Sequence, residues 1–191
     1  MARYHAERKA ETRQRIIKTA GQRLKKDGID GSGVAVLMSD AGLTNGAFYA
    51  HFDSKGDLVT SVVADQLSAQ EAVLASLAEG RAALEQFVRD YLSPGHRDRP
   101  ADGCPNAALL DEISRCDDAV RDTYTRGVQS IVDVVATHLS PHDPSAARTR
   151  ALGLFTGLVA SLQLARAVSD PTLSDEVLAA GIANAQLLLE G

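Results

Sequence analysis

The chain has 191 residues, a formal net charge of −5, 45% hydrophobic residues and 4% aromatic residues. Alanine and leucine dominate and no run alternates β-branched with polar residues, which excludes a β-rich fold and predicts an almost wholly α-helical one. With only two cysteines and no apolar N-terminal stretch, we expect a cytoplasmic protein and no signal peptide. The length suits a head of about 60 residues and a body of about 130.

Charge is distributed unevenly along the chain. Residues 1–60 hold ten lysines and arginines against seven acids, a net +3, whereas residues 61–191 hold ten against eighteen, a net −8. A basic head on an acidic body orients a protein on a polyanion. A charge of +3 also arises from random surface imbalance, so it becomes informative only together with the motif below.

The first helix is predicted over about 6–27, with Gly28 ending it. Basic residues precede its packed part, namely Arg3, Arg8 and Lys9. Such an arm either reaches a minor groove or phosphates, or is a solvated terminus, and the residues leave both interpretations open.

Residues 32–58 have the layout of a helix-turn-helix DNA reader. Apolar residues recur at i, i+3, i+4 and i+7 in a first short helix (Val34, Leu37, Met38 and Ala41). Gly42 follows, where a helix end favours a left-handed residue without a Cβ atom. Thr44 is of the N-cap type, and we expect its hydroxyl to cap the second helix.

The second short helix separates buried from exposed residues. Ala47, Phe48 and Phe52 form its buried side, which leaves a small, donor-rich exposed set of Thr44, Asn45, Gly46, Tyr49 and His51. Such side chains bond phosphates and base edges in a major groove. Ser54 and Asp57 are spaced as a capping box for the next helix, whose first turn carries Lys55.

This stretch resembles the N-terminal domain of TetR-family transcriptional regulators. The matching residues are Ala41, Gly42, Gly46, Tyr49, His51, Phe52, Ser54, Lys55 and Leu58. The resemblance implies a dimeric DNA-binding protein, usually a repressor released by a small molecule. It places Thr44, Asn45, Gly46, Ala47 and Tyr49 on the recognition helix. It implies phosphate contacts at Tyr49, His51 and Lys55. It also implies that Ser32 helps to start the preceding helix against the DNA backbone.

Three residues depart from the family pattern. Met38 stands where alanine is usual at the tight helix crossing, Gly33 where serine or threonine often bonds a phosphate, and Asp53 where lysine is common. Asp53 should cost some nonspecific affinity through repulsion. None of the three removes the reading surface.

The body is predicted to add six helices to the three of the head, giving about nine in an all-α fold, the number that the resemblance implies. All six prolines follow residue 93 and mark helix boundaries. The expected helices span about 54–78, 81–92, 105–115, 117–139, 144–169 and 174–190, with a loop over 93–103 and caps at Cys104, Asp143 and Ser174. We expect a DNA-binding domain over 1–55 and a ligand-binding and dimerisation domain over 56–191.

Residues 151–165 contain no charged residue. The segment is too short to span a membrane, which needs about 20 residues, so we expect a helix buried on several sides and no membrane partner. Small residues recur every four positions, at Gly153, Gly157, Ser161 and Ala165. With Ala179, Ala183 and Leu187 of the last helix, this stripe predicts a four-helix dimer interface, and the alternative is ordinary packing within the chain.

An effector pocket is expected between the helix that links head to body and the middle helices. The candidates combine apolar walls with a few polar points: Phe87, Tyr91, Asn106, Leu110, Tyr124, Phe155 and Gln163. For each of them, a place in the ordinary core is the competing interpretation.

Cys104 suggests a second mode of regulation. It is expected at a helix start, with Arg97 and Arg99 just upstream, where the helix dipole and positive charge favour a thiolate. The resemblance adds that some family members sense electrophiles or oxidants in this region, so Cys104 is a possible redox sensor. The alternative is an inert, buried cap residue.

Other chemistry is sparse in the sequence. There is no phosphate-cradling glycine loop, no CxxC pair and no nucleophile elbow, so we expect no cofactor, no metal and no catalytic residue. The sequence predicts a homodimeric regulator, most consistent with a repressor, that binds a palindromic DNA operator and releases it on binding a small-molecule effector. From another class, the alternative is a ligand-binding protein or enzyme that keeps this fold without binding DNA.

Overall fold

The computed structural model describes residues 2–190, the side chains of residues 2, 3 and 5 excepted. These residues form α1 (Ala2–Asp27), α2 (Val34–Asp40), the 3-10 helix η1 (Asn45–Ala50), α3 (Lys55–Ala75), α4 (Arg81–Tyr91), α5 (Pro94–Arg97), the 3-10 helix η2 (Pro100–Asp102), α6 (Pro105–Ile113), α7 (Asp118–Leu139), α8 (Pro144–Ala167) and α9 (Pro171–Glu190). The predicted all-α class is confirmed. Over the described range, no helix is long and apolar enough to cross a bilayer.

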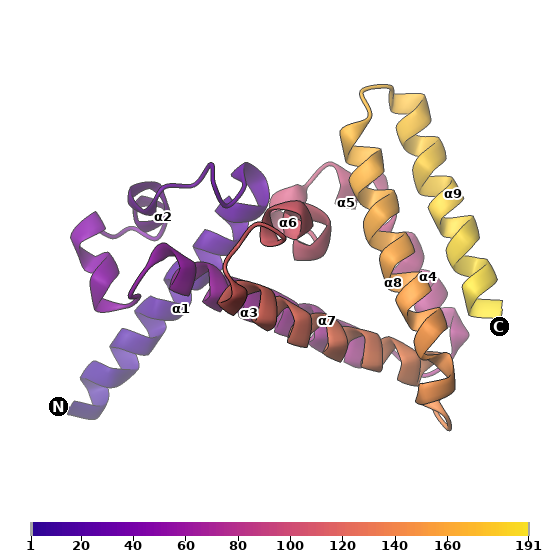
Figure 1. The fold of residues 1–191 in the computed structure, drawn as a ribbon, viewed down its shortest axis with the longest axis horizontal. Coiled ribbons are helices and arrows are strands. Elements are labelled where there is room, and N and C mark those ends of the chain that lie inside the picture. Colours follow the sequence, from indigo (N-terminus) through magenta and orange to yellow (C-terminus); the bar gives the residue numbers. More distant parts are fainter. Residues whose placement is uncertain (1, 191) are drawn as a thin grey trace.

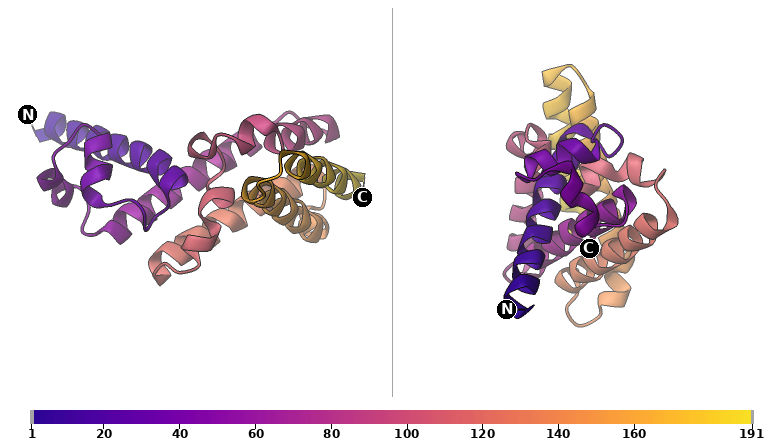
Figure 2. Two further views of the ribbon diagram at one scale, coloured as in Figure 1. Left: turned by 90° about the horizontal axis from the view of Figure 1, so that it is seen from above. Right: turned by 90° about the vertical axis from the view of Figure 1, so that its left-hand side faces the viewer.

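The molecule is elongated, with a small head at one end and a larger body at the other (Figures 1 and 2). The head consists of α1, α2, η1 and the start of α3. Its core is made of side chains that are at most 3% exposed: Ile16, Ile17, Ala20, Leu24, Leu37, Met38, Phe48, Phe52 and Leu58. Met38, which departs from the family pattern, is therefore accommodated in the packed centre of the head.

The long helix α3 joins the head to the body and runs parallel to α7. Near its start, the carboxylate of Asp117 lies beside Gly56. At its middle, Gly127 of α7 meets Leu67, because a Cβ atom at residue 127 would lie 2.4 Å from the leucine side chain. At its end, Nε2 of His138 lies 2.9 Å from the carbonyl oxygen of Leu74. The missing side chain at Gly127 thus lets α3 and α7 approach closely.

Helices α8 and α9 form an antiparallel hairpin at the far end of the body (Figure 1). A Cβ atom at Gly181 would lie 2.6 Å from Oγ of Ser161, so the glycine is needed for the close approach of the two helices. The hydroxyl of Ser174 donates a hydrogen bond of 2.7 Å to the carbonyl oxygen of Ala165.

Several predicted helix caps are confirmed. Ser54 accepts from the backbone N–H of Asp57, and Asp143 accepts from that of Ala146. Cys104 occupies the N-cap position of α6 without a side-chain capping bond. In the expected capping box, Asp57 instead accepts from the N–H of Asp53, one residue earlier than the usual partner.

The structure corrects three local predictions. Ser174 does not cap the last helix, which begins at Pro171 because proline suits the first helical position; the serine hydroxyl is buried against α8. The hydroxyl of Thr44 makes no capping bond. The segment 93–103 is not an irregular loop, because Ser93 caps the short helix α5 and a 3-10 turn follows.

The first helix also begins earlier than predicted, at Ala2. The guanidinium group of Arg8 lies over the ring of Tyr4 at 5.4 Å, a contact that supports the added turns. Arg8 and Lys9 are exposed on this helix. The side chain of Arg3 lies outside the described residues.

Candidate nucleic-acid interface and effector groove

The exposed residues of the helix-turn-helix lie on η1 and the turn before it. Thr44, Asn45 and Gly46 are exposed, Ala47 is half-buried, and Tyr49 is exposed over 77% of its surface. The second helix is a 3-10 helix over Asn45–Ala50, so it is tighter than an α-helix. The expected reading residues thus share one short element at the end of the head.

Two buried phenylalanines hold this element in place. Phe48 and Phe52 are at most 2% exposed and lie 5.7 Å apart between ring centroids. The ring of Tyr49 stands edge-on to Phe48 at 5.3 Å, and the guanidinium of Arg13 lies over Phe52 at 4.7 Å. Tyr49 is therefore oriented by the core while its hydroxyl points to solvent.

His51 is half-buried beside this surface. Its Nδ1 atom is buried without a hydrogen-bond partner among the described residues. Burial lowers the pKa of His51, and the neighbouring charges of Lys9 and Arg13 lower it further. The burial and the two neighbouring positive charges both favour the neutral form of the ring.

Two other expected DNA contacts make bonds inside the head. Ser32 is only 1% exposed, and its hydroxyl donates to the carbonyl oxygen of Gly28 at 2.8 Å, so it fixes the turn after α1 and does not face outward. Nζ of Lys55 donates to the carbonyl oxygen of Ile29 at 2.5 Å from a half-buried position. A DNA phosphate would have to share or replace that bond.

The head is joined to α6 through the turn that follows α1. The carboxylate of Glu112 accepts from the backbone N–H groups of Ile29 and Asp30, at 2.7 and 3.0 Å. Gly28 has a φ of 83°, and a Cβ atom there would lie 2.6 Å from the carboxylate. At the other end of α6, Nζ of Lys25 donates to the carbonyl oxygen of Gly103 at 2.9 Å.

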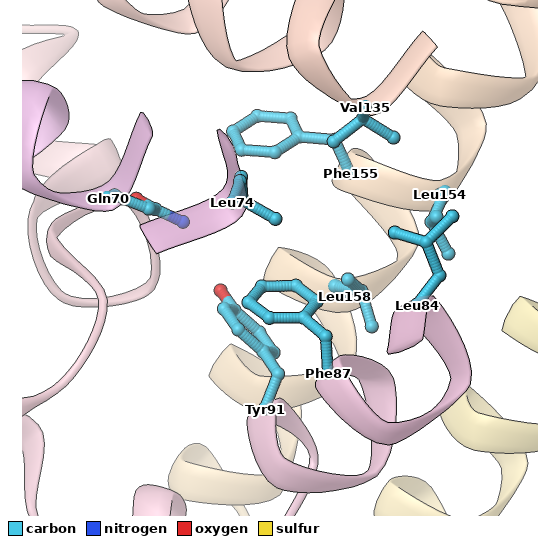
Figure 3. A pocket seen from close by; sticks show the side chains of 9 residues that line it. All are labelled: Gln70, Leu74, Leu84, Phe87, Tyr91, Val135, Leu154, Phe155 and Leu158. Carbon is cyan, nitrogen blue, oxygen red and sulfur yellow. The ribbon is translucent and has the colours of Figure 1, made fainter. Parts of the chain in front are cut away.

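Three of the seven expected pocket residues line an internal cavity between α3, α4, α7 and α8 (Figure 3). Its walls are Gln70, Leu74, Leu84, Phe87, Tyr91, Val135, Leu154, Phe155 and Leu158. The cavity holds about 20 Å³, enough for a water molecule but too little for a drug-sized effector.

A larger open groove lies on the other side of Phe87 and Tyr91. Its volume is about 330 Å³, and it lies between the ends of α1 and α6, the middle of α3, and α4. Its walls are Lys25, Gln66, Ala69, Gln70, Val73, Phe87, Tyr91, His96, Asp102, Gly103, Cys104 and Pro105. We call this space the effector groove.

The remaining four expected pocket residues lie away from the groove wall. Asn106 is fully buried behind it, Leu110 is 37% exposed on α6, Tyr124 is packed against the core, and Gln163 is half-buried on α8. Burial raises the pKa of Tyr124, so its hydroxyl stays protonated.

Cys104 lies in a hydrogen-bonded polar cluster at the groove wall. Nδ2 of Asn106 donates to Oε1 of Gln70 at 2.8 Å and to the sulfur at 3.4 Å, and the thiol lies 3.5 Å from the same Gln70 oxygen. The cysteine is only 7% exposed. Access to the thiol is therefore through the groove.

His96 supports this wall in a defined tautomer. The backbone N–H of Cys104 donates to Nε2 at 2.9 Å, so the proton resides on Nδ1, which donates to the carbonyl oxygen of Tyr91 at 2.7 Å. Burial lowers the pKa of His96; Arg166, Lys25 and Arg99 lower it further, against the effect of the Tyr91 carbonyl. The neutral ring is needed because a protonated Nε2 cannot accept.

The sequence predictions missed the residues that come from outside the middle helices. Lys25 belongs to the head, Gln70 and Val73 to the linking helix, and His96 to the segment predicted as a loop. These residues come together only through the tertiary contact between α1 and the segment around η2. Helical periodicity in the sequence therefore does not identify them. Among the described residues, no group of three or more His, Cys, Asp or Glu is arranged to hold a metal ion.

The expected dimer residues divide into two sets. Gly153, Ser161 and Ala165 are used inside the chain: the first two lie against Leu188 and Gly181 of α9, and Ala165 is 2% exposed. Gly157 is exposed and has no atom within 4 Å of the position of a Cβ atom. On α9, Ala179, Ala183 and Leu187 are exposed, Leu187 over 67% of its surface.

Comparison with known proteins agrees with the head and the whole fold. Residues 16–62 match the model of the bacterial regulatory proteins of the tetR family. No curated protein sequence gives a significant match. Structures similar to the whole chain include NemR of E. coli in its reduced form, with a TM-score of 0.78 and 18% identity over 93% of this chain and 96% of that one.

Two further structures extend the comparison. A TetR-family regulator of Agrobacterium tumefaciens gives a TM-score of 0.75 at 21% identity over 95% of this chain and 97% of that one. FadR of Bacillus subtilis in complex with stearoyl-CoA gives 0.65 at 15% identity over 93% and 98%. Residues 16–62 are therefore a helix-turn-helix DNA-binding domain, and the chain has the fold of the TetR-family transcriptional regulators.

The depressed pKa of His96 predicts a loss of stability in mild acid. Below the unfolded-state pKa of about 6.5, His96 is protonated in the unfolded chain but stays neutral in the native protein. The free energy of unfolding therefore falls as the pH falls, by up to about 1.4 kcal/mol per pH unit for this group. In His96→Gln, the decline between about pH 6.5 and 5 should be shallower than in the wild type. Urea unfolding across this range measures the slopes.

The matched control for that series is His142→Gln, at an exposed position in the turn before α8. It shows whether a change of slope depends on position 96 or on the loss of any one histidine. An unchanged slope in His96→Gln would contradict the assignment of a neutral, half-buried His96.

Proposed function

We propose that this protein is a homodimeric transcriptional repressor that binds a palindromic operator and leaves it when a small molecule occupies the effector groove. The observation that carries the proposal is the exposed polar face of η1, oriented by the buried Phe48 and Phe52 within a matched DNA-binding domain. DNA binding is assigned to residues 1–55, and effector binding and dimerisation to residues 56–191. FadR, which shares the fold, binds stearoyl-CoA, and this supports ligand binding in the body.

The charge distribution supports the same docking. The basic head is attracted to DNA phosphates, and the acidic body is repelled from them. In the head, Lys9 and Arg13 lie close enough to His51 for their charges to lower its pKa, in addition to the effect of burial.

Selection of bound fragments from a random DNA pool tests the proposal. We expect recovery of a two-fold symmetric site at near-physiological salt, because a dimer presents two recognition elements. Failure to enrich any sequence, with binding that disappears as salt rises, would favour the alternative of an enzyme or ligand carrier on this fold.

Lys55→Ala should weaken binding to all DNA sequences and lower the slope of log affinity against log salt by about one. The reason is the loss of one phosphate contact, and gel shifts at several salt concentrations measure it. Lys26→Ala is the matched control, since Lys26 is exposed in the last turn of α1, outside the helix-turn-helix. This variant should leave the slope unchanged.

Changes at Thr44 or Asn45 should instead alter which sequence is preferred, because base edges carry the sequence information. A change of preference in Lys55→Ala with an intact salt slope would contradict this docking geometry.

We further propose that the dimer forms through the outer faces of α8 and α9. These helices expose a set of small and apolar residues, namely Leu152, Gly157, Ala160 and Leu164 on α8, and Leu173, Ala179, Ala180, Ala183 and Leu187 on α9. Exposed apolar faces of this extent mark interaction surfaces. Gly157 would let a symmetry-related helix approach closely.

Leu187→Glu should convert the dimer to a monomer, because it places a charge in this proposed apolar interface. Its side chain is 67% exposed, so the monomer should keep its fold and helix content. Light scattering after gel filtration gives the mass. Leu110→Glu, at an exposed leucine of α6, is the control and should remain dimeric.

A second candidate is release of DNA by electrophiles or oxidants at Cys104. It is supported by the place of the thiol in the groove wall at the start of α6. N-ethylmaleimide should then abolish operator binding by the wild type and leave Cys104→Ser bound. Equal release of both proteins would exclude Cys104 as the sensor.

A further inference from the structure

The effector groove has a polar end and an apolar end. At the polar end are Lys25, Gln70 and Cys104, and toward the other end lie Val73 and Phe87. A second hollow of about 490 Å³ continues past Val73 and Phe87 toward Leu77. The space therefore suits an elongated molecule with one polar group and one apolar part.

Lys25 brings an incompletely compensated charge to the polar end. Its ammonium group bonds to the carbonyl oxygen of Gly103 at 2.9 Å, and within the described part of the chain it forms no ion pair. Burial lowers its pKa, which reflects the cost of the charge in this position. The negative charge of Asp102 acts against this lowering of the Lys25 pKa, but Asp102 is exposed at the edge of the groove.

A second cation lies behind the same wall. Arg166 is half-buried, and its guanidinium donates to the carbonyl oxygens of His96, Arg97 and Ala107. It too forms no ion pair with any described carboxylate. A buried and a half-buried cation, each held only by neutral carbonyl groups, give this end of the groove a positive potential that an anion would relieve.

Two buried polar atoms at this end lack a hydrogen-bond partner among the described residues, the hydroxyl of Tyr91 and Oδ1 of Asn106, and of these the hydroxyl is able to donate. The hydroxyl of Tyr91, a residue only 7% exposed, makes no hydrogen bond of good geometry among the described residues, although burial and the nearby thiol of Cys104 raise its pKa. Figure 3 shows that it points toward the side from which Gln70 approaches. Because Oε1 of Gln70 already accepts from Asn106, its amide NH₂ is the part left for a ligand.

We propose that the effector is a small organic acid whose carboxylate binds Lys25 and the Tyr91 hydroxyl. Its apolar part lies along Val73 and Phe87. This inference rests on the proposed function and specifies the chemical class of the effector.

The same contact explains how binding reaches the DNA-binding head. Lys25 is part of α1, and its bond to Gly103 ties the end of that helix to the segment before α6. A carboxylate that draws the ammonium group toward the groove would lengthen its bond to the Gly103 carbonyl, so such a ligand binds best where that tie is loosened. Such a difference in affinity between two head positions is what a regulator needs to shift its population.

Binding of octanoate and 3-phenylpropionate, each compared with the alcohol of the same skeleton, tests the proposal. Isothermal titration of the full-length protein should show at least one acid binding about tenfold more tightly than its alcohol, the effect of one charge-assisted hydrogen bond. Lys25→Met should remove this preference by weakening the acid alone. Lys26→Met, on the same turn but outside the groove, should bind as the wild type does.

Tyr91→Phe gives an independent variant, because it removes only the unpartnered hydroxyl and keeps the ring. The acid should bind severalfold more weakly. Equal binding of acids and alcohols, or no acid binding below millimolar concentration, would overturn the proposal. So would an acid preference that persists in both Lys25→Met and Tyr91→Phe.

The selected operator links binding to regulation. The acid that binds should release wild-type protein from it, and Lys25→Met should need about tenfold more of the same acid. If an operator is found and N-ethylmaleimide releases it while neither acid does, the organic-acid proposal fails and the proposed function stands. If no operator is enriched, the proposed function fails whatever the acids do.

Discussion

The arrangement of this molecule depends on the carboxylate of Glu112, which accepts hydrogen bonds from two consecutive backbone N–H groups after α1. Those donors are at the end of a helix in the head, and the acceptor is near the end of α6 in the body. Gly28 makes the contact possible, since its positive φ and missing Cβ atom leave room for the carboxylate. The position of the reading surface relative to the groove therefore follows from the position of α6.

The other contacts of α1 restrict how the head can move. On α3, Ser61 and Asp65 accept hydrogen bonds from Arg13 and Gln14, so α1 is fixed along one side. Lys25 ties its end to the backbone before α6. A change at the start of α6 can thus reach the head at two places, through Lys25 and through the Glu112 end of the same nine-residue helix.

The head could be predicted from its sequence because its signals are local. The spacing of Leu37, Met38 and Ala41, the glycine turn and the serine cap each act within a few residues. The groove could not, because Lys25 and Gln70 face it only through packing of distant segments. Segment 93–103 escaped prediction for a similar reason: its short helix is held by Arg97, which bonds Ser174 and Asp175 of α9, and by Arg166 of α8. The small-residue stripe on α8 predicted close packing but not whether the partner helix belonged to the same chain.

The continuity of α3 has a consequence for how the protein can be divided. Leu58, Val59 and Val62 are buried, and Val62 lies against Gly21 of α1, so the core of the head includes side chains beyond residue 55. The family match likewise extends to residue 62. A fragment ending at residue 55 would leave the face of α1 that covers α3 open to water. The smallest autonomous piece must carry the first turns of α3, and in the intact chain heat should melt the two parts as coupled units, because one uninterrupted helix belongs to both.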